Sequence, residues 1–128
     1  MINEPSAKQL KGIPALYTTE AISTEDKVVY AHFRIFDSHW YIMEFDQVDS
    51  LFGYCILSGD LQNSEYGYVS MADLRQIKVL GQFEVEFDTY WEPKPAGEVE
   101  LIRRGGGIFS DTDSAPDRDP WVWYSLET

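Results

Sequence analysis

The sequence predicts an α+β domain: an antiparallel sheet of about five strands, one short helix and a partly flexible C-terminal tail. Runs rich in β-branched and aromatic residues recur up to residue 91, and turn residues separate them. One stretch near Ser70 instead spaces its apolar residues as a helix does. Beyond residue 96 the composition shifts toward glycine and aspartate, which is typical of a loop or linker.

Length and composition favour one folded domain. The chain has 128 residues, enough for a hydrophobic core, and aromatic residues make up 15% of it. We expect a flexible lead-in over residues 1–12, the α+β domain over 13–96 and an extension over 97–128. The single cysteine, Cys55, excludes an internal disulfide and a cysteine-rich zinc site.

Local composition predicts the first three strands. Val28–Phe36 combines β-branched and aromatic residues, and His39–Phe45 has the same character. Because only Asp37 and Ser38 separate these segments, they are predicted to form a hairpin. The third strand, Leu51–Ser58, is almost continuously apolar, which indicates a central position or burial on both faces.

The helix falls between the last two predicted strands. A short fourth strand, Tyr66–Val69, precedes Ser70, which is a good N-cap. Apolar residues then recur at helical spacing, so the helix is predicted over about Ser70–Val79. Phe83–Trp91 alternates apolar and acidic residues and forms the fifth strand, and two prolines after it end the pattern.

The extension after residue 96 has three parts. Residues 103–107 are Arg-Arg-Gly-Gly-Gly, and residues 111–119 are acidic. The end of the chain carries Trp121, Trp123 and Tyr124, which are too apolar for a solvated tail. We therefore expect this aromatic end to dock on the domain, while the glycine and aspartate parts stay flexible.

The chain is strongly acidic, and its charge is unevenly distributed. The net charge is −12, and no Lys or Arg occurs between Phe36 and Leu74. A nucleic-acid backbone or an anionic membrane requires a basic surface, so both are excluded as partners. The acidic charge then favours binding of cations, binding of a basic protein surface, or solubility alone. No apolar run has the length of a membrane span or a signal peptide, so we expect a cytoplasmic protein.

An acidic row on the fifth strand is the main candidate binding surface. Alternate residues of a strand share a face, so Glu84, Glu86 and Asp88 are expected about 6.5–7 Å apart. That spacing is close to the distance between phosphates along one DNA strand. Glu44 and Asp46 on the neighbouring hairpin extend the surface. Three interpretations stay open: a solvated strand face, imitation of DNA and a cation site.

Tyrosines near this row are candidate anchors for a protein partner, because exposed aromatic side chains often dominate binding energy. They are Tyr54, Tyr66 and Tyr90. The first two belong to aromatic–glycine–tyrosine segments centred on Gly53 and Gly67. Glycine inside a strand often marks a bulge or the close approach of another backbone. Sheet packing and a ligand groove are therefore both open for these segments.

Two other functions fit parts of the pattern. A hydrolase or nuclease dependent on a divalent metal would gather Glu44, Asp46, Glu84 and Glu86 around the cation. A nuclease also needs basic residues to hold its substrate, and the acidic middle of the chain has almost none. A scaffold or oligomerisation module would use the aromatic end of the chain. The pattern favours a non-enzymatic protein without a metal or cofactor.

Two histidines flank the turn of the first hairpin. His32 and His39, together with Asp37, could form a small metal or acid–base site. Their spacing matches no defined ligand motif, so surface positions are the alternative interpretation.

Six segments of the chain carry a resemblance to a known family: IPALYTTE, DKVVYAHF, WYIMEFD, LFGYCI, EYGYVSMADL and FEVEFDTYWEPKP. In order and spacing they resemble a small bacterial domain-of-unknown-function family, over about Ile13 to Pro95. This family is found mainly on plasmids, integrative elements and prophages. It usually has an arginine between two acids of the last strand, and Phe87 stands at that place here.

The resemblance implies a setting in mobile DNA, where small acidic proteins are often anti-restriction or anti-CRISPR inhibitors, some of which imitate DNA. This is an association with a family and not a property of a site. Together with the charge, it predicts a non-enzymatic acidic binding protein whose partner is a basic, DNA-handling protein.

Overall fold

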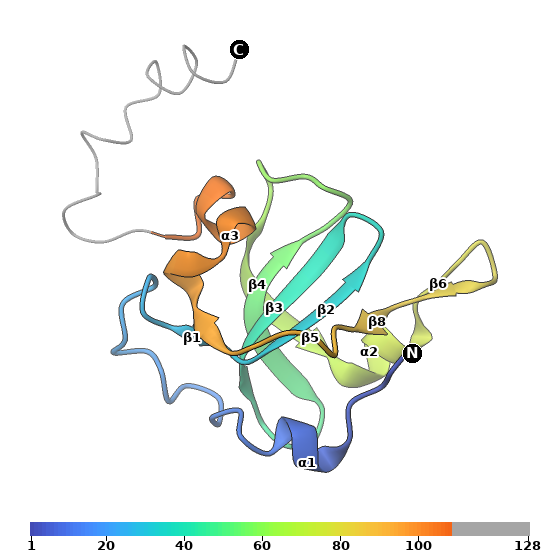
Figure 1. Ribbon diagram of the computed structural model, residues 1–128, viewed down its shortest axis with the longest axis horizontal. Helices are drawn as coiled ribbons and strands as arrows, with labels where there is room; N and C mark the ends of the chain where they lie inside the picture. The colour runs from blue at the N-terminus through green and yellow to red at the C-terminus, as the bar shows by residue number, and fades with distance from the viewer. Residues whose placement is uncertain (109–128) are drawn as a thin grey trace, which may run out of the picture.

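The structure is a computed structural model that describes residues 1–108. It confirms an α+β domain around a five-stranded antiparallel sheet (Figure 1). The predicted docking of the aromatic end of the chain lies outside the described residues. In chain order the elements are α1 (Ala7–Leu10), β1 (Val28–Val29), β2 (Ala31–Ile35), β3 (Ser38–Phe45), β4 (Ser50–Ile56), β5 (Glu65–Ser70), α2 (Met71–Gln76), β6 (Lys78–Val79), β7 (Phe83–Glu84), β8 (Glu86–Phe87), β9 (Lys94–Pro95), the 3₁₀ helix η1 (Ala96–Glu98) and α3 (Glu100–Arg104).

The central sheet has the strand order β5-β4-β3-β2-β8. The predicted hairpin of β2 and β3 is confirmed, with Ala31 opposite Ile42 and Ile35 opposite Ser38. The apolar strand β4 lies between β3 and β5, as its composition indicated. Two small sheets, β1–β9 and β6–β7, flank the central one.

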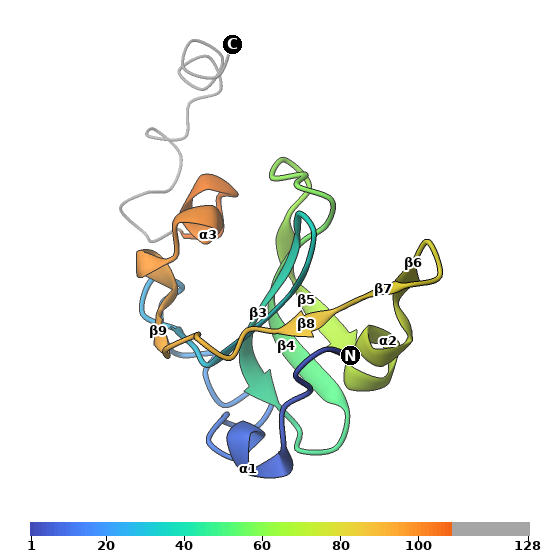
Figure 2. The same ribbon diagram turned by 45° about the vertical axis from the view of Figure 1, so that its right-hand side comes forward.

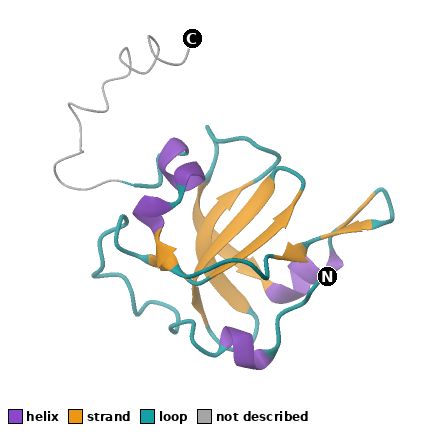
Figure 3. Ribbon diagram, viewed as in Figure 1, coloured by secondary structure: helices purple, strands orange, loops and turns teal. Residues whose placement is uncertain are grey.

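Both faces of the sheet are covered, so β3 is buried from Trp40 to Phe45. Figures 2 and 3 show η1 and α3 on one side of the sheet and α2 on the other. Alternate residues of β3 therefore enter two separate cores. The core on the α2 side includes Phe33, Trp40, Ile42, Met71, Leu74 and Val85. The core on the α3 side includes Tyr41, Met43, Tyr54, Ala96, Val99 and Ile102.

Three predicted elements differ from the structure. The predicted strand Val28–Phe36 is two strands, because Val28–Val29 forms β1 and pairs with β9, whereas Ala31–Ile35 forms β2. The helix ends at Gln76, earlier than predicted, because Lys78–Val79 belongs to β6. Phe83–Trp91 is not one strand but two short ones separated by Val85. The first of them, β7, pairs with β6 in a hairpin that projects from the domain, whereas β8 pairs with β2 (Figure 1). The chain therefore changes partner at Val85, which is fully buried.

The two ends of the described chain are tied to the sheet. The expected lead-in contains α1, whose N-cap Ser6 forms a capping box with Gln9. Ile2 makes a parallel bridge with Glu86. At the other end, Ile102 of α3 is fully buried. The helices of residues 1–108 are all too short to span a bilayer.

Candidate functional site

Two acids of the predicted row, Glu84 and Glu86, are engaged in ion pairs. Glu84 lies 2.5 Å from the Met1 amine and 3.6 Å from Lys78 Nζ. The hydrogen bond and the charge of the amine hold the pKa of Glu84 below its usual value. Glu86 accepts a hydrogen bond from Arg34 Nε at 3.2 Å. These pairs join distant segments and offset part of the acidic charge, so both residues have a role in the fold.

Glu44 was predicted on an outer face, and that placement is wrong. The residue is 3% exposed, and its carboxylate accepts hydrogen bonds from Tyr17 N at 2.8 Å, from Thr19 N at 3.0 Å and from the Thr19 hydroxyl. The buried Lys27 ammonium donates to the Thr19 carbonyl. A β-bulge between Ile42 and Glu44 shifts the alternation of β3 and turns the carboxylate toward this loop.

Asp46 is exposed, as predicted, but its carboxylate organises a turn. Asp46 Oδ1 accepts backbone hydrogen bonds from Asp49 at 2.7 Å, Val48 at 2.8 Å and Ser50 at 3.0 Å. These bonds, with that of Asp49 the strongest, hold the pKa of Asp46 below its usual value. The residue therefore fixes the connection between β3 and β4.

The three predicted tyrosine anchors have different positions. Tyr54 is 1% exposed, and its hydroxyl donates to the Gly105 carbonyl at 2.8 Å, so it is a core residue and not an anchor. Tyr66 is half-buried and donates to the Gly107 carbonyl at 2.7 Å. Tyr90 is 90% exposed, and among the three it alone presents a whole ring to solvent.

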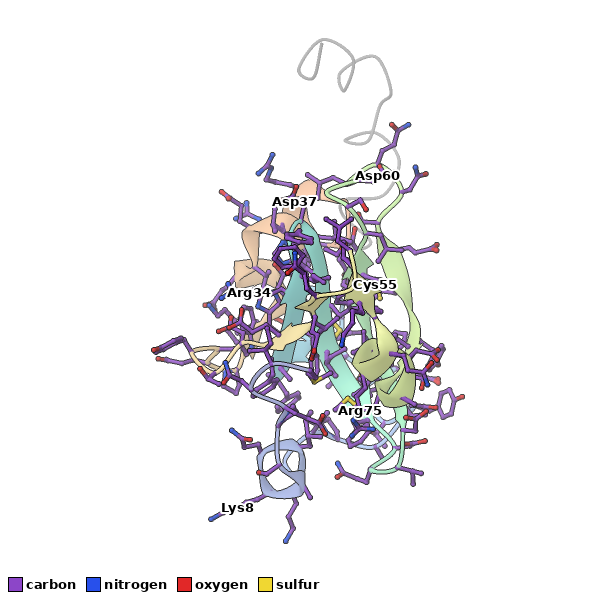
Figure 4. All side chains as sticks on the ribbon, turned by 90° about the vertical axis from the view of Figure 1, so that its right-hand side faces the viewer. Lys8, Arg34, Asp37, Cys55, Asp60 and Arg75 are labelled. Atoms are coloured by element: carbon purple, nitrogen blue, oxygen red, sulfur yellow. The ribbon has the colours of Figure 1, made fainter. Side chains whose placement is uncertain are left out.

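A hydrogen-bonded chain of Asp88, His32 and His39 crosses the hairpin of β2 and β3. His32 Nδ1 lies 2.9 Å from Asp88 Oδ2, and His32 Nε2 lies 2.9 Å from His39 Nδ1. The two imidazole rings are nearly parallel, and Tyr41 stacks on His32 with centroids 4.6 Å apart. The two histidines were predicted to form a site with Asp37, which lies at the hairpin end (Figure 4). The carboxylate in the chain is instead that of Asp88, which bonds to His32.

The protonation of this chain follows from its partners. Burial raises the pKa of Asp88, but hydrogen bonds from His32 and from the Tyr90 amide outweigh this, so the pKa lies below its usual value. An ionised carboxylate only accepts, so His32 Nδ1 donates to it. Burial lowers the pKa of both histidines. In the neutral pair His39 Nδ1 then donates to His32 Nε2, which leaves His39 Nε2 as an acceptor.

The arrangement can take up one proton without breaking. A proton on His39 Nε2 leaves every hydrogen bond of the chain intact, whereas a second proton on His32 places two N–H groups face to face. Within the described part of the chain, no three His, Cys, Asp or Glu side chains form a group suited to a metal ion. Burial raises the pKa of the Cys55 thiol to about 11, which makes it a poor nucleophile at neutral pH.

Asp88 also lines a groove formed by the connection between β8 and η1. This groove has a volume of about 580 Å³, and we call it the acidic groove. The residues that line it are Asp88, Tyr90, Trp91, Glu92, Pro93, Lys94 and Glu98. It thus combines three carboxylates and two aromatic rings with one ammonium group.

The backbone and two side chains hold the acidic groove in place. Asp88 Oδ1 accepts a hydrogen bond from Tyr90 N at 3.0 Å, which closes the turn after β8. Trp91 Nε1 donates to the Val29 carbonyl at 2.9 Å, so its ring is fixed against β1. Lys94 Nζ lies 4.6 Å from the centroid of this ring, in a cation–π contact.

Most of the acidic groove was missed from the sequence. Asp88 and Tyr90 were singled out, but as parts of a continuous strand. Glu92 and Lys94 flank Pro93, which was expected to end the strand, and Glu98 lies beyond the second proline. The segment Tyr-Trp-Glu-Pro-Lys-Pro, with aromatic, acidic and basic residues side by side, was the available signal.

The fold and groove define the class: a small α+β domain with an antiparallel sheet and an acidic, aromatic groove beside its β8 edge. Residues 15–99 match the family described as "Protein of unknown function (DUF2958)", and the chain belongs to this family. The resemblance seen in the sequence over about Ile13 to Pro95 is thereby confirmed. The chain has no significant match among the curated proteins or the solved structures.

Proposed function

We propose that this protein is a non-enzymatic binding protein that accepts a basic segment of a partner protein in the acidic groove. The observation that carries the proposal is the contact of Lys94 Nζ with the Trp91 ring, because it places a cation inside the groove. A lysine or arginine of a partner would meet the same ring and the carboxylates around it. Tyr90 supplies an exposed ring at the rim.

Charge supports the same proposal. Glu92 and Glu98 are exposed and line the acidic groove together with the ionised Asp88, against the single ammonium of Lys94. The whole chain carries a net charge of −12, which attracts basic partners over a distance set by the ionic strength. Binding is therefore expected to weaken as salt rises, mainly through slower association.

The finer form of the proposal concerns the partner. We propose a DNA-handling defence protein, which would make this chain an anti-restriction or anti-CRISPR inhibitor of a mobile element. The family resemblance and the acidic charge support this. The proposal does not use imitation of DNA by the row of Glu84, Glu86 and Asp88, because each of them contacts a basic or imidazole group of the chain itself.

Calorimetry with synthetic peptides tests the groove. Hexa-arginine is titrated into the full-length protein, and hexa-glutamate serves as the control peptide. Two double variants lose the same charge at different places: Glu92→Gln with Glu98→Gln in the groove, and Glu4→Gln with Asp37→Asn on exposed sites elsewhere. We expect the groove variant to bind about tenfold more weakly and the other to change by less than about threefold.

The proposal fails if both double variants weaken binding equally, because net charge alone would then explain it. It also fails if Tyr90→Ala binds hexa-arginine as wild type does. Raising the salt from about 50 mM to about 200 mM should weaken binding to wild type severalfold.

A further inference from the structure

The two edges of the central sheet are treated differently. The edge formed by β8 is covered, since Ile2 N donates to the Val85 carbonyl at 2.8 Å and Phe87 N donates to the Ile2 carbonyl at 2.9 Å. At the opposite edge, β5 pairs with β4, and no other strand of residues 1–108 lies beside it. In Figure 4 β5 runs along the right-hand rim of the molecule. An uncovered edge strand is a template for pairing with another chain.

The register shows which backbone groups of β5 face outward. Ser50 lies opposite Ser70. Met71 N, one residue after Ser70, donates to the carbonyl of Asp49, one residue before Ser50, at 2.8 Å. Ser50 and Ser70 are therefore a non-hydrogen-bonded pair, and the pairs alternate from there along the strand. It follows that the N–H and C=O of Tyr68 point away from β4. The pairing between β4 and β5 is continuous, so the alternation is not interrupted.

An exposed aromatic pair stands beside this edge. Tyr68 is 55% exposed, and its ring centroid lies 6.3 Å from that of Tyr17, which is 64% exposed. Tyr17 has a positive φ of 69°, a conformation unfavourable for a bulky residue. The buried Glu44 carboxylate holds it there through the Tyr17 N–H. Strained positions held by buried groups often occur at binding sites.

The formal charge carried by β3, β4 and β5 has one sign. The segment without Lys or Arg, from Phe36 to Leu74, includes β3, β4 and β5, so the open edge belongs to the acidic half of the sheet. Glu65 at the start of β5 is exposed, and so is Asp73 in the first turn of α2. Glu20 is exposed and acts electrostatically on the Tyr68 hydroxyl. The strand has no lysine, proline or bulge of the kind that protects edges.

We propose that the β5 edge binds an extended basic segment of a partner protein by strand addition, with Tyr17 and Tyr68 as its aromatic contacts. The outward backbone groups of Tyr68 supply the central hydrogen bonds, and the surrounding carboxylates select a Lys- or Arg-bearing strand. The site lies on the sheet edge opposite β8, so it is separate from the acidic groove. The two sites have in common only that each would bind a basic partner.

The test uses a seven-residue peptide of alternating lysine and valine, blocked at both ends, and the same peptide with glutamate in place of lysine. Binding to the full-length protein is measured by calorimetry, and amide hydrogen exchange is followed by NMR. We expect the lysine peptide to slow the exchange of the Tyr68 amide at least tenfold. The glutamate peptide should have no effect.

N-methylation separates strand pairing from attraction between charges. Because only alternate residues of an added strand face β5, methylating one alternate set of peptide nitrogens should weaken binding at least tenfold, while methylating the other set should change it little. Tyr68→Lys should weaken binding to a similar degree, and Tyr90→Lys should not. Glu20→Gln with Glu65→Gln, beside β5, should weaken binding of the lysine peptide more than Glu92→Gln with Glu98→Gln in the groove.

Three results would overturn the proposal. In the first, both methylated peptides bind as tightly as the unmethylated one. In the second, the Tyr68 amide of the protein alone is already protected at every concentration, which means that the chain itself covers the edge. In the third, this protection appears only as concentration rises, together with a dimer in sizing experiments, which means that a second copy occupies it.

Discussion

Two glycines that face each other across β4 and β5 are predicted to respond in opposite ways to alanine. Gly53 and Gly67 are paired in the register, and both lie in an aromatic–glycine–tyrosine segment. A Cβ at Gly53 would overlap the carbonyl group of Tyr41 on β3, which is backbone and cannot rotate away. A Cβ at Gly67 meets no atom within 4 Å. Neither glycine has a positive φ, so the difference is steric.

The expected free energies follow from these contacts. Overpacking a core usually costs about 1–3 kcal/mol, and a clash between backbones exceeds this because two strands must separate. Gly53→Ala should therefore lower the free energy of unfolding by at least about 3 kcal/mol. Gly67→Ala should raise it by up to about 1 kcal/mol, because alanine restricts the unfolded chain.

Urea denaturation followed by tryptophan fluorescence measures both variants, and thermal denaturation provides a second readout. About 3 kcal/mol corresponds to a fall in Tm of roughly 10 °C for a domain of this size. A free energy of unfolding for Gly53→Ala within about 0.5 kcal/mol of wild type would show that β3 and β4 do not approach as closely as described. The same would follow if the two variants lost similar stability, since the register of β3, β4 and β5 predicts a difference.

Three further outcomes are expected. Glu44→Gln should lower the free energy of unfolding by about 1–3 kcal/mol in urea denaturation, because the new NH₂ group would face N–H donors that now bond to the carboxylate. The exposed Glu65→Gln should change this free energy little. The free energy of unfolding should fall as pH drops below about 6.5, because the unfolded chain then takes up protons on His32 and His39, whereas burial keeps the pKa values of both residues low in the folded protein. Replacing both histidines by asparagine should flatten this pH dependence. Asp88→Asn should lower the pKa of His32 further in an NMR titration, because the hydrogen bond and charge that favour its protonated form are lost.

Much of the sheet was predictable because its strands carry local signals. The hairpin of β2 and β3 followed from two β-rich runs around a two-residue turn. The start of α2 followed from Ser70, whose hydroxyl accepts from Asp73 N at 3.2 Å as an N-cap should. These features depend on neighbours within a few positions of the chain.

The side-chain environments were less predictable, because they depend on distant contacts. Regular alternation along β3 would place Glu44 in the same core as Trp40 and Ile42. A bulge that has no sequence signature places Phe45 in that core instead and turns Glu44 toward the loop that contains Tyr17 and Thr19. The burial of Tyr54 depends on Gly105, which is far away in the sequence.

The candidate site shows the same limit. Asp88 and Tyr90 were identified from their residue types, but their grouping with Trp91 and Glu98 depends on how the segment after β8 folds back along β1. Two prolines were expected to end the strand, but β8 already ends at Phe87 and Pro95 itself lies in β9. The ion pair of Glu86 with Arg34 likewise joins positions that only the sheet brings together.

The most direct test of the proposed function is an NMR titration of the full-length protein with hexa-arginine, which reads the acidic groove residue by residue. We predict saturable shifts of the Tyr90 amide, the Glu98 amide and the Trp91 indole N–H, which is fixed by its bond to the Val29 carbonyl. These shifts should be reversed by added salt. Shifts spread evenly over the acidic surface, or none at the indole, would contradict the claim that the groove is the binding site.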